Sequence, residues 1–212
     1  RPPRSTQGVS SAASDVYKRQ DGDTHNYYEL EVNAFGTEWD LILLKPYHDG
    51  DKVALDSWDI PGLVSKVHVD GTINDPSDMD RGWSIELAIP WKSFINNFRS
   101  KAPPIDGQIW KVNFSRVHWD TEIIDGKYVK TDSPEFNWVW SPQGLIYMHM
   151  PHFWGLVQFS ENIAGETKVQ FKKSDIDQIK WSLRQVYYRQ RNHYFRHSRY
   201  TSSLKALNLM DK

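Results

Sequence analysis

The chain has 212 residues, ten Trp and no Cys, with a net charge of −1. The absence of Cys excludes disulfides and thiolate metal sites, and no apolar run approaches the roughly 20 residues that a transmembrane helix needs. The net charge hides a division, because residues 21–160 carry 11 Lys and Arg against 21 Asp and Glu, whereas residues 161–212 carry 11 against 5. An acidic, Trp-rich body argues against nucleic-acid binding, which needs a basic face. Composition leaves the oligomeric state open.

Residues 1–20, RPPRSTQGVSSAASDVYKRQ, differ in character from the remainder of the chain. They are Ser-rich, show no apolar period and lack the apolar core of a secretory signal. The last ten residues resemble the translation of a sequencing adapter, and an ordinary disordered N-terminus is the alternative. We therefore predict a non-native or disordered leader at 1–20 outside the fold, and we expect that a native N-terminal portion is missing.

The segment from 21 to 160 has the pattern of an all-β domain. Within residues 27–33, Tyr28, Leu30 and Val32 fall on one face of a predicted half-buried strand. Residues 39–45 resume the strand pattern after a turn, so the pair predicts a β-hairpin. Further strands are predicted at 64–69, 83–89, 109–119, around 128–129, 138–140 and 154–159. Short strands divided by turn clusters indicate a sandwich or barrel, with one short helical stretch at 90–94.

Residues 161–212 change to a helical period and form a predicted basic helical C-terminal extension. Asp175 is a candidate cap, and a second short helix is predicted from Thr201 to Leu209. The apolar stripe consists of Ile176, Ile179, Leu183, Val186, Tyr187 and Tyr194. Two interpretations stay open: the stripe packs on the β-domain, or the basic helix anchors the chain to an anionic surface or partner.

Five phrases occur in an order that resembles family 9 carbohydrate-binding modules of bacteria. They are DGDTHNYYELEVN at 21–33, GWSIELAIPW at 82–91, WKVNFSRVHWD at 110–120, NWVWSP at 137–142 and MPHFWGLVQF at 150–159. The resemblance implies an immunoglobulin-like β-sandwich at 21–160 that binds polysaccharide. It also implies an extracellular or periplasmic protein that acts in polysaccharide breakdown, beside glycoside hydrolases.

Sugar recognition combines flat aromatic faces with planar polar groups that bond to hydroxyls. The predicted carbohydrate-binding residues are Trp138, Trp140, Asn137, Glu31, Glu29, Asn113, Arg116 and Trp58. Trp138 and Trp140 are two residues apart and share a face, which is either a ligand surface or the core side. Glu29 and Glu31 are alternatively a solvated face or partners of Arg116. The tryptophans predicted to be core are Trp83, Trp91, Trp110 and Trp154.

Two other functions and one metal enter as alternatives. A haem-binding sandwich is one, because Met148-His149-Met150 and His152 supply the types of axial ligand that haem takes. A glycoside hydrolase is the other, but it needs two carboxyls at a fixed separation, and no pair stands out, so no catalytic residue is predicted. Asp21, Asp23 and Asn26 offer hard oxygen ligands for a structural Ca²⁺; no other cofactor is predicted.

Overall fold

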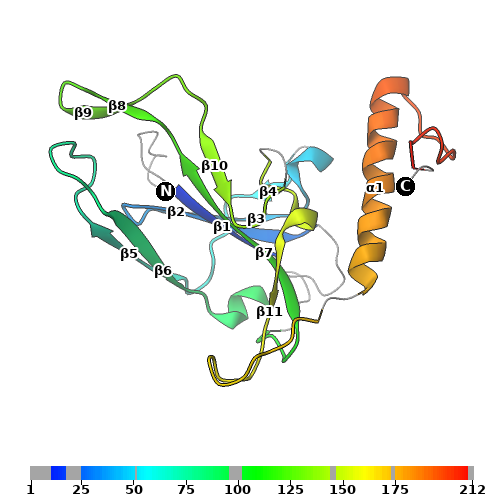
Figure 1. The fold of residues 1–212 in the computed structure, drawn as a ribbon, viewed down its shortest axis with the longest axis horizontal. Helices are drawn as coiled ribbons and strands as arrows, with labels where there is room; N and C mark the ends of the chain where they lie inside the picture. The colour runs from blue at the N-terminus through cyan, green and yellow to red at the C-terminus, as the bar shows by residue number, and fades with distance from the viewer. Residues whose placement is uncertain are drawn as a thin grey trace. The chain divides into compact units, whose positions relative to one another are not determined.

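The computed structural model describes residues 11–17, 25–50, 52–95, 102–143, 147–172 and 175–209. It divides the chain into two compact units, Arg1–Glu166 and Thr167–Lys212. The first unit is built mainly of antiparallel β-sheets, and the second contains an α-helix (Figure 1). Among the described residues, no helix combines the length and the apolar character needed to cross a membrane.

The strands of the first unit follow the predicted hairpin and strand pattern from residue 27 onward. They are β1 (Ser11–Tyr17), β2 (Tyr27–Asn33), β3 (Glu38–Leu43), β4 (Ala54–Leu55), β5 (Val64–Asp70), β6 (Gly82–Ala88), β7 (Ile109–His118), β8 (Thr121–Ile124), β9 (Lys127–Lys130), β10 (Phe136–Val139) and β11 (Gly155–Gln158). Three short 3-10 helices lie between them: η1 (Tyr47–Asp49), η2 (Trp91–Phe94) and η3 (Pro151–Phe153). The predicted hairpin is confirmed as the antiparallel β2–β3 pair.

Seven strands form the main sheet, in the order β10-β7-β1-β2-β3-β4, with β11 also paired to β7. Two further pairs, β5–β6 and β8–β9, are separate antiparallel hairpins. The long strand β7 is therefore shared, because β10 pairs with its second half and β11 with its first.

Strand β1 comes from the segment expected to lie outside the fold. Its backbone pairs with β2 on one side and with β7 on the other. A strand in this position completes two ladders of backbone hydrogen bonds that its neighbours would otherwise leave open. This arrangement differs from the expectation for residues 1–20, while a foreign origin of the segment stays a prediction.

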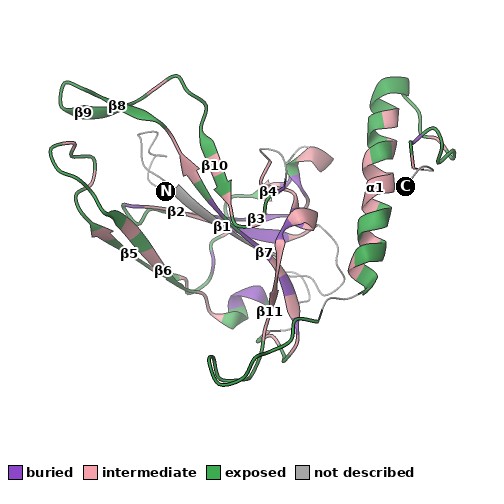
Figure 2. Ribbon diagram, viewed as in Figure 1, coloured by how far each residue is buried: buried purple, intermediate pink, exposed green. Residues whose placement is uncertain are grey.

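The core lies on both faces of β2 and β3 (Figure 2). On one face Tyr28 packs in a cluster with Trp110, and Leu30 and Val32 pack with Ile60. On the other face Tyr27 packs with the buried residues Leu41, Leu43, Val53 and Trp154. The first half of β2 is therefore buried on both sides, whereas its alternating sequence predicted burial on one side only.

The β5–β6 hairpin covers the face of the main sheet that carries Leu30 and Val32. Val67 of β5 and Ile85 of β6 pack against the cluster formed by these residues and Ile60. Beyond this contact, the loop end of the hairpin lies next to the C-terminal half of β7, and the cavity described below lies between them.

The second unit consists of α1 (Asp175–His197) and a segment that folds back on it. Gln190 holds both backbone groups of Thr201 through its side-chain amide, and the rings of Tyr194 and Tyr200 lie 4.8 Å apart. The predicted helix at 201–209 is wrong, because residues 204–208 form turns only. Ser203 does accept a hydrogen bond from the Ala206 amide, as a helix cap would, but the positive φ of Asn208 ends the turn.

Candidate functional site

The predicted sugar-binding residues lie on two opposite faces of the main sheet. Successive residues of a strand alternate between faces, and paired residues of neighbouring strands share one. Arg116 of β7 pairs with Trp138 of β10, so both belong to the face that β5–β6 covers. Asn113 belongs to the opposite face, as do Glu29, Glu31 and Asn137 according to the strand register. The structure therefore does not bring all the predicted residues together in one site.

Trp138 presents an open indole beside two nitrogen-bearing side chains. Its side chain is 56% exposed. The Arg116 guanidinium carbon lies 5.3 Å from the centroid of the indole, and the His118 ring stacks on it at 5.8 Å with an interplanar angle of 23°. Such stacking restrains the orientation of the indole, while its exposed area remains open to a ligand.

Trp140 has a different environment on the same face. It is 53% exposed, contacts the edge of the Phe114 ring at 5.8 Å, and lies directly over Gly155 of β11. A Cβ atom on that glycine would stand 2.4 Å from Cζ3 of the indole, well inside van der Waals contact. The absence of a side chain at Gly155 therefore gives Trp140 its place on the sheet.

Asn113 supports this region from the opposite face. It is buried, with 1% exposure, and its Oδ1 accepts hydrogen bonds from the backbone amides of Ser141 at 2.9 Å and Phe114 at 3.1 Å. The Asn113 side chain thus holds the turn that follows Trp140. The burial and the two hydrogen bonds of Asn113 are explained by a role in supporting the backbone, without contact to a ligand.

Glu29 lies in a buried polar cluster. It is 3% exposed, and its Oε1 stands 3.9 Å from Nε2 of His149, whose Nδ1 lies 3.1 Å from the Tyr27 hydroxyl. Burial lowers the pKa of His149 to about 4, so the imidazole is neutral at pH 7. Neutral imidazole suits a packed position between Tyr27 and Glu29. Glu31 and Asn137, by contrast, are half-buried.

Packing accounts for Trp58, the predicted site residue in a loop. Its ring lies 5.1 Å from that of Tyr28, and its side chain packs against the two core clusters that contain Tyr28 and Leu30. The core predictions hold for Trp110 and Trp154, which are buried. They are wrong for Trp91, which is 42% exposed, and incomplete for Trp83, which is half-buried and lines a cavity.

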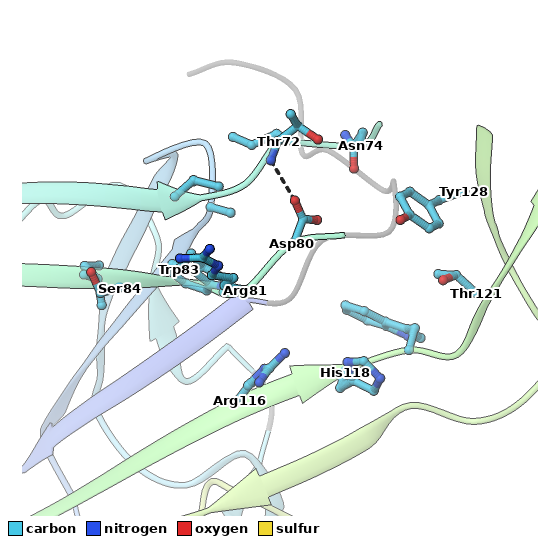
Figure 3. A pocket seen from close by; sticks show the side chains of 16 residues that line it. Thr72, Asn74, Asp80, Arg81, Trp83, Ser84, Arg116, His118, Thr121 and Tyr128 are labelled. Carbon is cyan, nitrogen blue, oxygen red and sulfur yellow. Dashed lines mark hydrogen bonds between the residues drawn. The ribbon is translucent and has the colours of Figure 1, made fainter. Parts of the chain in front are cut away.

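This cavity lies between the end of the β5–β6 hairpin and the β7–β8–β9 segment (Figure 3). Its volume of about 620 Å³ falls within the roughly 300–1,000 Å³ of ligand pockets. The lining residues are Ala34, Val69, Thr72, Ile73, Asn74, Asp80, Arg81, Gly82, Trp83, Ser84, Ile85, Arg116, His118, Trp119, Thr121 and Tyr128. Sequence reasoning missed all of them except Arg116; the signal was the run of Arg116, His118 and Trp119 at the end of the longest predicted strand.

Hydrogen bonds and a cation–π contact order the cavity wall. Asp80 accepts a hydrogen bond from the Thr72 amide at 2.6 Å (Figure 3), and Arg81 stands 3.8 Å from Asp70. The ring of Trp119, another lining residue, is contacted by the Lys130 ammonium, which lies 3.6 Å from its centroid. The wall therefore carries charged groups of both signs that already have protein partners, next to three aromatic rings, Trp83, Trp119 and Tyr128.

The residues considered as Ca²⁺ and haem ligands are described only in part. The part of the chain that the structure describes contains no group of three or more His, Asp or Glu side chains able to hold a metal ion. Asp21 and Asp23, two of the residues predicted for Ca²⁺, lie outside the described residues. Among the candidate haem ligands, His149 directs its ring nitrogens toward Tyr27 and Glu29.

In comparisons with known proteins, no family model, no curated protein and no solved structure matches the chain. The likeness to family 9 carbohydrate-binding modules therefore stays a prediction from the residues.

Proposed function

We propose that residues 21–160, together with strand β1, form an immunoglobulin-like β-sandwich, similar to family 9 carbohydrate-binding modules, that binds polysaccharide without cleaving it. The observation that carries the proposal is the open indole of Trp138, flanked by Arg116 and His118. In this view the protein supports glycan breakdown outside the cytoplasm, and its ligand is a sugar chain held at the surface.

The chemistry of this surface suits a sugar ring. One face of a pyranose is lined with C–H groups and packs against a flat indole, while its hydroxyls bond to planar polar groups at the rim. Arg116 supplies N–H donors, and the ring nitrogens of His118 add further hydrogen-bonding groups. Both groups are already positioned against the indole, so little conformational freedom is lost when a ligand binds.

The arrangement favours binding over hydrolysis. A glycosidase holds two carboxyl groups on either side of the scissile bond. Among the described residues that line the cavity beside Trp138, the carboxyl group belongs to Asp80, and it is bonded to the Thr72 amide. A single carboxylate engaged in holding a loop does not provide an acid–nucleophile pair.

The haem alternative is weaker for a geometric reason. An axial histidine must direct a ring nitrogen at the iron. His149 has Nδ1 at 3.1 Å from the Tyr27 hydroxyl and Nε2 at 3.9 Å from the Glu29 carboxylate. Ligation through His149 would require the imidazole to leave this buried cluster.

The proposal is tested by calorimetry and affinity electrophoresis on a panel of soluble plant polysaccharides. We expect Trp138→Ala to weaken binding about tenfold or more, because a nucleobase stacked on one aromatic ring contributes on the order of 1–3 kcal/mol and we expect a similar order for a sugar ring. Phe195→Ala is the matched control, since it removes an aromatic ring that is 90% exposed on the helical unit. Equal affinity in Trp138→Ala and the unaltered protein contradicts the proposal, as does failure of the unaltered protein to bind any member of the panel.

A further inference from the structure

We infer that the cavity between the β5–β6 hairpin and the β7–β8–β9 segment is a second sugar subsite, so that the ligand is an extended neutral oligosaccharide. The inference rests on the proposed function, because it assigns the cavity to the same sugar chain that stacks on Trp138. It adds a binding site formed by residues outside the predicted set.

The cavity is continuous with the indole surface through two shared residues. Arg116 and His118 line the cavity, and the same two side chains contact the ring of Trp138 at 5.3 and 5.8 Å. Figure 3 shows both extending from β7 below the loop that carries Thr72 and Asn74. Arg116 and His118 therefore border both the Trp138 ring and the cavity, which places the two proposed binding surfaces next to each other.

The lining of the cavity has the composition that a second sugar ring needs. Trp83, Trp119 and Tyr128 supply aromatic area, and Asn74 and Thr121 supply neutral groups that can bond to hydroxyls. Tyr128 comes from β9 and faces the cavity opposite the loop of Asn74 (Figure 3). Each side of the cavity therefore combines aromatic area with an amide or hydroxyl group, the two kinds of surface that bind the faces and the hydroxyls of a pyranose.

The cavity favours a neutral chain because its three charged lining residues, Asp80, Arg81 and Arg116, each have a protein partner. Asp80 is bonded to the Thr72 amide, and Arg81 lies within salt-bridge distance of Asp70. Lys130, which is close by, is placed over the Trp119 ring. A ligand with its own carboxylate or phosphate would also approach a segment that carries 21 acidic against 11 basic residues. Hydroxyl groups bond to this wall without displacing its internal partners.

The test uses calorimetry with cello-oligosaccharides and xylo-oligosaccharides, in each case from the monosaccharide to the hexasaccharide. We expect affinity to rise about tenfold or more as the ligand grows long enough to occupy both subsites, and then to level off. Tyr128→Ala should remove this gain while leaving the affinity for the shortest bound sugar unchanged. Trp138→Ala should lower affinity at every length. Val129→Ala, the adjacent residue of β9, is the matched control.

A second variant is needed because Tyr128→Ala alone does not distinguish loss of the subsite from unfolding of the β8–β9 hairpin. Thr121→Trp fills the cavity from β8 and should likewise abolish the gain with length. The second subsite is overturned if affinity does not depend on ligand length, or if it rises with length in Tyr128→Ala and Thr121→Trp as much as in the unaltered protein. In either case, binding that still depends on Trp138 upholds the proposed function. Absence of binding at every length in the unaltered protein overturns both. A charged series of matched length, glucuronic-acid-substituted xylo-oligosaccharides, should bind no tighter than the neutral series, and tighter binding contradicts the assignment to a neutral chain.

Discussion

Replacement of His149 should change how the stability of the protein depends on pH. In the folded chain its pKa is about 4, against about 6.5 in an unfolded chain. This difference corresponds to roughly 3 kcal/mol of unfolding free energy, at 1.36 kcal/mol for each pH unit between the two values. Because the unfolded chain binds the proton first, the contribution is present in full above pH 6.5. It is lost as the pH falls from 6.5 to about 4.

The assay is urea denaturation of the unaltered protein and of His149→Gln at several pH values between about 7.5 and 4. The glutamine lowers stability at neutral pH, because the Tyr27 hydroxyl loses its 3.1 Å partner, but it cannot be protonated. We therefore expect the gap between the two proteins to shrink as the medium is acidified. His68→Gln, at an exposed position of β5, is the control and should follow the unaltered protein. A constant gap across this range would refute the reasoning.

Three further predictions concern the support of the aromatic surface. Gly155→Ala should displace the Trp140 indole, since the new Cβ atom would meet it at 2.4 Å; the cost in unfolding free energy should vanish in a Trp140→Ala background, as a double-mutant cycle would measure. Trp58→Ala should cost about 2 kcal/mol or more in a urea titration, because its ring packs on Tyr28, and loss of sugar binding without loss of stability would favour its predicted ligand role instead. Asn113→Ala should cost roughly 1–3 kcal/mol by the same titration, since the part-buried Ser141 and Phe114 amides lose the acceptor that the buried Asn113 side chain provides; an unchanged midpoint would contradict that support.

Local periodicity was sufficient to predict most of the strands and the long helix. The alternation in residues 27–33 placed Tyr28 and Leu30 on a buried face correctly, because the side-chain period of a strand is two. The same rule placed Trp138 and Trp140 on one face. It could not show that Tyr27 and Glu29 would also be buried, because their cover comes from distant residues such as Trp154 and His149.

The candidate site required information that spacing does not contain. Whether Glu31 and Arg116 face the same side depends on the register across β1, which joins β2 to β7, and a shift of one residue would reverse the answer. The cavity depends further on two hairpins meeting the end of β7, a contact between segments more than thirty residues apart in the sequence. Amino-acid patterns identify which residues suit sugar binding, whereas pairing between strands decides which of them can act together.

This separation of the two faces bears on how the protein would recognise a sugar chain. Two buried polar residues of the opposite face are committed to protein contacts: Asn113 holds two backbone amides, and Glu29 lies against His149. A ligand that used them would have to displace those contacts and bear the cost of leaving buried polar groups unpaired. Trp138 and its neighbours require no such exchange, because their aromatic area is already exposed and their side chains are already in place. Binding energy at this surface is thus available to the ligand, so selectivity among sugar chains should depend on the residues around Trp138.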